Sequence, residues 1–152
     1  MNNHADKAKE LFEQGYNCAQ AVLLAFEDVT GLDTETAAKL SSSFGGGMGR
    51  MREVCGAVSG ALMVLGIKQG YSDPTAKEEK HAHYENIQEF ARRYKEENGS
   101  IICRELLAGV PKTDGANPEA RTPEYYKKRP CGELVWFAAK TLDDMLNEGI
   151  NV

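Results

Sequence analysis

Apolar residues recur every three or four positions along most of the chain, which is the spacing of one face of an α-helix. Strict alternation of apolar and polar residues, the mark of a strand, is nearly absent. The pattern predicts helices over residues 5–14, 17–30, 33–44, 54–68, 74–98 and 130–147, and a short helix after Ser100. Asn17, Asp33 and Ser100 can cap the starts of their helices. We expect an all-α fold: a compact single-domain bundle of about six or seven helices, spanning residues 1–152.

The composition is that of an ordinary globular protein with its own core. The chain has 152 residues, 41% hydrophobic and 27% charged, and a domain of this size buries roughly 70% of the surface of its unfolded chain. The net charge of −5 argues against a nucleic-acid partner. No apolar run approaches the roughly 20 residues that cross a bilayer, so no membrane partner is expected. The first residues lack a basic region followed by an apolar stretch, so no signal peptide is predicted and cytoplasmic residence is expected.

Four cysteines each fall on the apolar face of a predicted helix and should point toward a common core. They are Cys18, Cys55, Cys103 and Cys131. Three of them lie in a first helical turn, and so does Cys103 if its short helix starts at Ser100. Free backbone N–H groups and the helix dipole favour a thiolate there, which lowers the pKa and makes the sulfur a nucleophile or a metal ligand. The alternative is inert burial, because free cysteine also packs as a small hydrophobic residue.

The spacing of the cysteines matches no local metal or redox motif. Cytoplasmic thiols are kept reduced, so permanent structural disulfides are not expected. The chain contains no C-x-x-C, which excludes the common zinc-ribbon, thioredoxin and ferredoxin patterns. A site shared by these cysteines must therefore be assembled by the tertiary fold.

A glycine-rich stretch, Gly45 to Gly49, precedes the second cysteine. It completes neither G-x-G-x-x-G nor G-x-x-x-x-G-K-[ST], and no strand leads into it, so a nucleotide loop is not predicted. Gly47 and Gly49 leave a loop without Cβ atoms that a cofactor or a second backbone can approach, and Gly56 and Gly60 form a small-residue ridge in the next helix. These four glycines are candidate cofactor-contacting positions, with simple close packing as the alternative.

Two further features are candidates for the surroundings of the cysteines. Arg50 and Arg52 can stabilise a thiolate or bind an anion, although loop arginines are more often solvated. Residues 108–124 form one long polar segment with two glycines and three prolines. Loops of this length are usually functional or mobile, and we expect this one to lie over the cysteine region.

The segments that contain the cysteines resemble those of a known protein family. Cys18 lies within G-Y-N-C-A-Q-A-V, and Cys55 begins a match to a CGAxxG motif. With the later Cys103 and Cys131, these segments resemble the C_GCAxxG_C_C family of redox-active proteins. The resemblance covers about residues 15–146, and every cysteine of the pattern is present. It implies a redox or metal-linked role for the cysteines and supplies no substrate.

Three functions therefore stand open. The first is thiol/disulfide electron transfer, as in a thiol-dependent oxidoreductase; four cysteines allow three pairings. The second is metal binding, with the four thiolates as ligands of zinc or of an iron–sulfur cluster. The third is a helical interaction module with inert cysteines. The resemblance favours the first. The redox partner or small-molecule substrate is not identified, and a homodimer is compatible with a small helical bundle.

Overall fold

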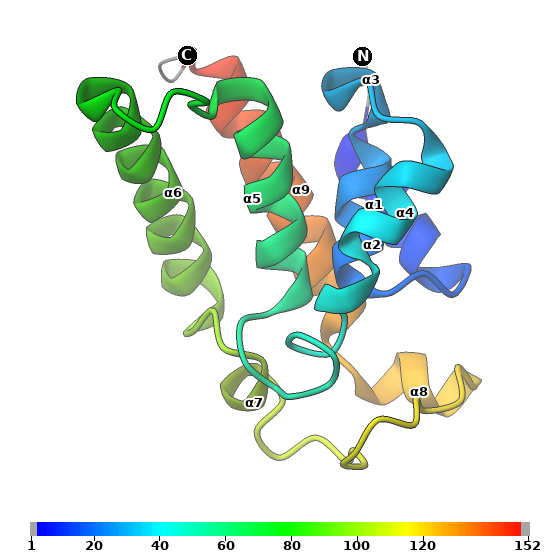
Figure 1. Ribbon diagram of the computed structural model, residues 1–152. Coiled ribbons are helices and arrows are strands. Elements are labelled where there is room, and N and C mark those ends of the chain that lie inside the picture. Colours follow the sequence, from blue (N-terminus) through cyan, green and yellow to red (C-terminus); the bar gives the residue numbers. More distant parts are fainter. Residues whose placement is uncertain (1–2, 150–152) are drawn as a thin grey trace.

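A computed structural model describes residues 3–149 and confirms the all-α prediction (Figure 1). Six helices in this part of the chain have eight residues or more: α1 (His4–Glu13), α2 (Cys18–Ala25), α4 (Thr34–Ser41), α5 (Gly56–Gln69), α6 (Lys77–Asn98) and α9 (Cys131–Asn147). The shorter elements are α3 (Glu27–Thr30), α7 (Cys103–Leu106), α8 (Pro123–Lys128) and a 3-10 turn, η1 (Ser42–Phe44). Among the described residues, β-type pairing is limited to one isolated bridge between Val54 and Ile102.

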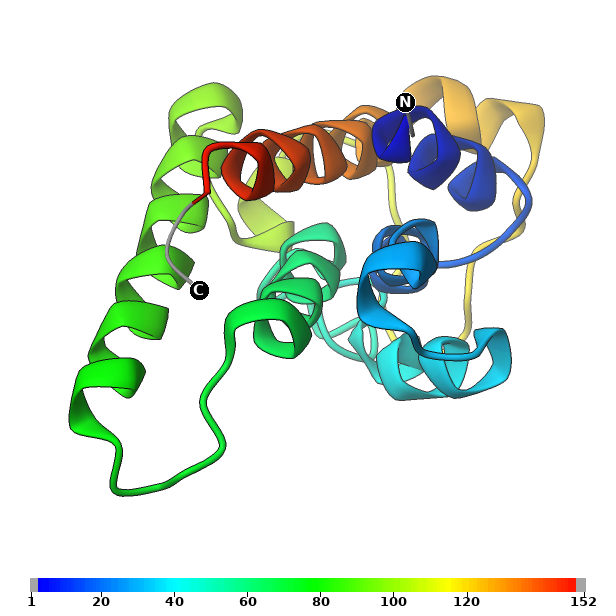
Figure 2. The same ribbon diagram turned by 90° about the horizontal axis from the view of Figure 1, so that it is seen from above.

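The central helices share one direction along the bundle. α2 and α5 pack side by side, and α9 contacts both of them (Figure 1). α1 lies along α9 on one side of the molecule, and α6 lies against α9 and α5 on the other (Figure 2). The N-terminal ends of α2, α5 and α9 consequently meet at one end of the bundle, the lower end in Figure 1.

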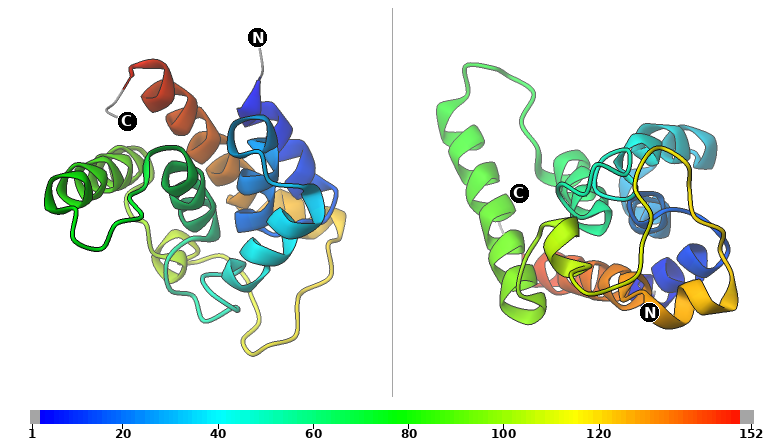
Figure 3. Two further views of the ribbon diagram at one scale, coloured as in Figure 1. Left: turned by 45° about the horizontal axis from the view of Figure 1, so that its top comes forward. Right: turned by 90° about the horizontal axis from the view of Figure 1, so that it is seen from below.

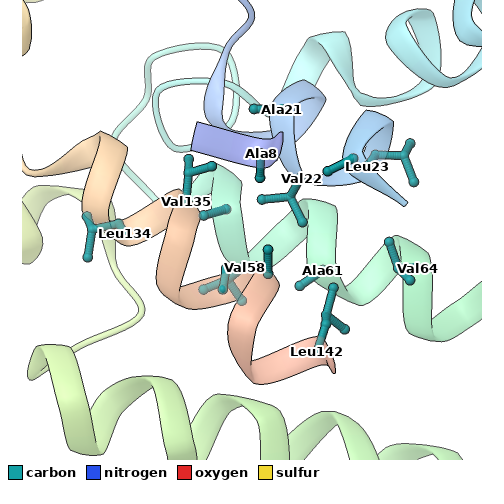
Figure 4. Packing of buried hydrophobic residues seen from close by; sticks show 14 of the residues in the cluster. Ala8, Ala21, Val22, Leu23, Val58, Ala61, Val64, Leu134, Val135 and Leu142 are labelled. Carbon is teal, nitrogen blue, oxygen red and sulfur yellow. The ribbon is translucent and has the colours of Figure 1, made fainter. Parts of the chain in front are cut away.

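Small and branched side chains fill the space between these helices (Figure 4). Val58 and Ala61 of α5 lie in the same buried cluster as Val22 of α2. A Cβ atom built on Gly60 would lie only 2.6 Å from the carbonyl oxygen of Ala19. The small-residue ridge therefore packs deep in the bundle, as the close-packing alternative predicted, and it sets the approach of α2 to α5.

Two predicted helices end earlier than expected. α2 ends at Ala25 instead of continuing to Thr30, because Phe26 turns out of the helix with φ −106° and ψ 26°. The ring of Phe26 stacks on that of His4, with centroids 4.1 Å apart, before the chain resumes as α3. The helix predicted to reach Phe44 ends at Ser41 and tightens into η1.

Two other predicted helices start later, and one helix was missed. α5 begins at Gly56, because the preceding residues pair with residues 101–103. α6 begins at Lys77 instead of residue 74, because Asp73 accepts hydrogen bonds from the backbone and hydroxyl of Thr75 at 2.9 and 2.8 Å and forms a turn. α8 lies at the end of the predicted long loop; Thr122 caps it and Pro123 occupies its first turn.

Candidate functional site

Helix starts bring the four cysteines to one end of the bundle. Cys18, Cys103 and Cys131 are the first residues of α2, α7 and α9, and Cys55 is the N-cap residue of α5. The start of α2 is fixed by a capping box, in which the Asn17 side chain accepts from the Gln20 backbone at 2.9 Å and the Gln20 side chain accepts from the Asn17 backbone at 3.1 Å. Each of the four therefore lies at a helix N-terminus. The prediction that Ser100 caps the short helix is wrong, because α7 begins at Cys103 with Ile102 as its N-cap residue, and the Ser100 hydroxyl accepts from the Ile102 backbone at 2.9 Å instead.

Backbone hydrogen bonds hold Cys55 and Cys103 side by side. The Cys55 N–H donates to the carbonyl of Ile101 at 2.7 Å, and the Cys103 N–H donates to the carbonyl of Glu53 at 2.6 Å. The isolated bridge lies between these two bonds. This short clamp ties the start of α5 to the start of α7, far apart in the sequence.

The glycine-rich loop before Cys55 turns through left-handed backbone conformations. Met48, Arg50 and Arg52 share these conformations, with φ of 69°, 65° and 62°, which few residues other than glycine adopt. A Cβ atom on Gly47 would lie 2.7 Å from the Cβ of Cys103. The loop thus needs glycine where its backbone passes a cysteine, and it carries two arginines on a backbone that most residues avoid.

Residues 111–122, which we call the strap, cross the same end of the bundle (Figure 3, right). Arg50 fastens the strap by donating to the carbonyls of Thr113 and Gly115 at 3.0 and 2.5 Å. Arg121 donates two hydrogen bonds of 2.9 Å to carbonyls at the end of α1 and just beyond it. The strap lies over the cysteine region, as predicted for residues 108–124.

These segments surround a cavity of about 580 Å³, which we call the cysteine cavity. This volume falls within the range of small-molecule binding sites. All four cysteines line it. Its other walls include the arginines Arg50, Arg52, Arg121 and Arg129, and the apolar side chains Phe12, Leu106, Leu107 and Leu134.

Cys18 and Cys131 influence each other's pKa more than any other group does. A hydrogen bond between the two thiols, helped by the charges of Arg129 and Arg121, lowers the pKa of Cys131 to about 7. The same interaction and burial raise the pKa of Cys18 well above its usual value. The two shifts run in opposite directions, so a singly ionised pair would hold its negative charge at Cys131 and its proton at Cys18.

The other two cysteines correct the expectation that every helix N-terminus here lowers a thiol pKa. Burial raises the pKa of Cys55 to about 11, although a hydrogen bond between its sulfur and the hydroxyl of Tyr94 at 3.4 Å acts in the opposite direction. Burial also raises the pKa of Cys103, although Arg52 lies 4.0 Å from its sulfur and opposes the shift. Desolvation of these sulfurs outweighs the helix ends.

The carboxylate of Glu119, in the strap, lies close to three of the arginines that line the cavity. One oxygen of Glu119 lies 3.2 Å from Arg50 and 3.5 Å from Arg52, and Arg129 contacts the same oxygen. Burial works against ionisation of Glu119, but the hydrogen bond and charge of Arg129 hold its pKa below the usual value. The expectation that loop arginines are solvated is wrong for Arg52, which is only 8% exposed.

Several residues that surround the cysteines were not among the candidates from the sequence. Arg129 stands two positions before Cys131, and this proximity was the available signal for it. Tyr94 is buried on α6 together with Phe90, and no feature of the sequence around it indicates contact with a cysteine. The position of Glu119 depends on the path of the strap, for which the sequence contains no periodic signal.

Three of the four candidate glycines, Gly47, Gly49 and Gly56, line the cysteine cavity, whereas Gly60 lies at the contact of α2 with α5. Among residues 3–149, no three histidine, cysteine, aspartate or glutamate side chains form a group that could hold a metal ion. The described residues therefore offer no ligand set for the zinc or iron–sulfur alternative.

Comparison with known proteins agrees with the cysteine pattern. The model of a family described as "Putative redox-active protein (C_GCAxxG_C_C)" matches residues 16–145, a span that contains all four cysteines and the strap. No curated protein and no solved structure matches the chain. Within the described part of the chain, every helix is too short or too polar to cross a membrane.

Proposed function

The chain belongs to the family described as "Putative redox-active protein (C_GCAxxG_C_C)", and from that premise we propose that it carries out thiol–disulfide exchange with the Cys18–Cys131 pair. The observation that carries the proposal is that both cysteines line the cysteine cavity at the starts of α2 and α9, two helices that pack against each other. The mutual effect of the two thiols on their pKa values supports the same pairing. Of the three pairings that four cysteines allow, this arrangement favours Cys18 with Cys131.

The two sulfurs have different parts in the exchange. Cys131 is the nucleophile, since its pKa of about 7 leaves much of it as thiolate near neutral pH. Cys18 keeps its proton until a mixed disulfide has formed, because its pKa is raised. Arg129, which donates to the Cys131 sulfur, stabilises the thiolate.

The exchange balances as a two-electron reduction of a substrate disulfide. The Cys131 thiolate attacks one sulfur of the substrate, the substrate S–S bond breaks, and the first thiolate leaves. Cys18 then attacks the Cys131 sulfur of the mixed disulfide, and its proton goes to a departing thiolate. The products are a Cys18–Cys131 disulfide, one thiol and one thiolate. A cytoplasmic dithiol is the class of reductant that resets the pair, in keeping with the expected compartment.

Disulfide mapping tests the proposal. Protein purified without oxygen is exposed to a mild disulfide oxidant, digested without reduction and analysed by mass spectrometry. We expect a Cys18–Cys131 crosslink that a dithiol reverses, its loss in Cys131→Ser, and its retention in the control Cys103→Ser. Metal content is measured on the same sample. Stoichiometric iron or zinc with all four thiols masked, or four thiols that resist oxidation, would overturn the proposal.

A further inference from the structure

The cysteine cavity has more positive charge than its own residues neutralise. Among the described residues that line it, four are arginines and one, Glu119, is acidic. Ionisation of Cys131 would add one negative charge and still leave the cations in excess. Buried charges are costly unless they are paired. A cavity with this balance favours an anionic ligand.

Arg52 has a buried donor that no group in the described structure uses. Its side chain is 10% exposed, and its Nη2 donates to the carbonyl of Thr113 at 3.1 Å. Its Nε–H, in contrast, is buried without a hydrogen-bond partner. An unsatisfied buried donor costs about 1–3 kcal/mol, so one that persists calls for a partner. Arg52, whose backbone is left-handed with φ of 62°, lines the cavity.

Access to the sulfurs limits the size of the substrate. Cys131 is 8% exposed and lies in the wall of a cavity that the strap covers. This burial favours a molecule that fits within about 580 Å³ over a disulfide on the surface of a folded protein. Phe12, Leu106 and Leu107 offer such a molecule an apolar wall.

We propose that the cysteine cavity binds a small anionic molecule through Arg52, and that the substrate of the Cys18–Cys131 pair is a low-molecular-weight disulfide bearing a carboxylate or a similar anionic group. The second half of this inference rests on the proposed function. The guanidinium of Arg52, in the cavity wall, attracts the anionic group, the apolar wall contacts the body of the molecule, and its S–S bond faces Cys131. The exchange is the two-electron reaction balanced above.

A series of disulfides that differ in charge tests the substrate class on the wild-type protein. The series consists of dithiodipropionate, which carries two carboxylates, hydroxyethyl disulfide, which is neutral, and cystamine, which carries two ammonium groups. The rate of oxidation of the reduced protein is divided by the rate of the same disulfide with mercaptoethanol, which removes differences between the leaving thiols. We expect the normalised rate to be at least roughly tenfold higher for dithiodipropionate than for the neutral compound, and lowest for cystamine.

Two substitutions test whether Arg52 causes the preference for the anionic disulfide. Arg52→Gln should remove most of this preference, whereas Arg92→Gln, which deletes an exposed arginine of α6, should leave it unchanged. Equal normalised rates for the three disulfides, with the Cys18–Cys131 crosslink formed, would overturn the anion preference and leave the redox function standing.

Binding of octanedioate, the carbon analogue of dithiodipropionate, separates the two proposals because it involves no redox step. Calorimetry on the reduced protein should show binding of octanedioate and not of octanediol, and Arg52→Gln should weaken it about tenfold or more. Binding without any disulfide exchange would support the anion site and overturn the redox function. Absence of octanedioate binding would overturn the anion site.

Discussion

Replacement of Gly60 by alanine should destabilise the protein, whereas the same replacement at Gly66 should stabilise it. Both glycines lie in α5. A Cβ atom on Gly60 would lie 2.6 Å from the carbonyl oxygen of Ala19 and 3.1 Å from the Cβ of Val22, both on α2. A Cβ atom on Gly66 would meet nothing within 4 Å. The two substitutions are chemically identical and differ in what the added methyl group contacts.

The difference in the free energy of unfolding follows from this geometry. In a helix, alanine is favoured over glycine by roughly 0.5–1 kcal/mol, partly because it restricts the unfolded chain. That gain applies to both variants and cancels when they are compared. At Gly60 the methyl group must push α2 and α5 apart, since a backbone oxygen cannot rotate away, and overpacking of this kind costs about 1–3 kcal/mol. The two variants should therefore differ by about that amount.

Urea denaturation under reducing conditions measures the difference. Gly66→Ala should raise the midpoint and Gly60→Ala should lower it, with the slope m unchanged in both. In thermal melts, each kcal/mol should move Tm by about 2–4 °C for a chain of this length. Equal midpoints for the two variants, or a Gly60→Ala protein more stable than Gly66→Ala, would refute the inference that Gly60 sets the distance between α2 and α5.

Three further predictions concern the sulfurs and the strap. The rate of alkylation of Cys131 by iodoacetamide should rise through about pH 7 as the thiolate forms, and Cys18→Ala should move this rise to higher pH because a stabilising hydrogen bond is lost; an unchanged profile would contradict the assignment. Tyr94→Phe should lower the free energy of unfolding by about 0.5–1.5 kcal/mol in urea titrations, since the hydrogen bond to Cys55 is lost. Arg50→Ala should speed proteolytic cleavage within the strap, because it removes the hydrogen bonds from Arg50 to the strap carbonyls; equal cleavage rates would show that other contacts hold the strap.

The sequence correctly predicted those parts of the fold that depend on residues close together along the chain. Apolar spacing located each of the six long helices, and Asn17 and Asp33 cap their helices as predicted, with Asp33 accepting from the Thr36 backbone at 3.1 Å. The errors lie where distant residues act. α2 breaks where Phe26 stacks on His4, and α5 is shortened by pairing with the segment before α7.

The candidate site could be predicted only in outline for the same reason. That the cysteines lie at helix starts and face inward follows from local pattern, and all four do line one cavity. Which two cysteines influence each other's pKa depends on how α2 is placed against α9, and no spacing along the chain encodes that placement. The burial of Arg52 could not be predicted either, because a left-handed backbone is unusual for a residue other than glycine.

The four sulfurs share the same kind of helix terminus, so the terminus cannot explain why they differ. Burial raises the pKa of Cys55 and of Cys103 despite their positions at helix starts. Cys131 is distinguished by side-chain donors, since it accepts hydrogen bonds from Cys18 and Arg129. A phenol hydroxyl at Cys55 and a guanidinium 4.0 Å from Cys103 do not have the same effect. Hydrogen bonds to the charged form therefore distinguish the pKa of Cys131 from the other three, while the helix ends supply a background common to all four.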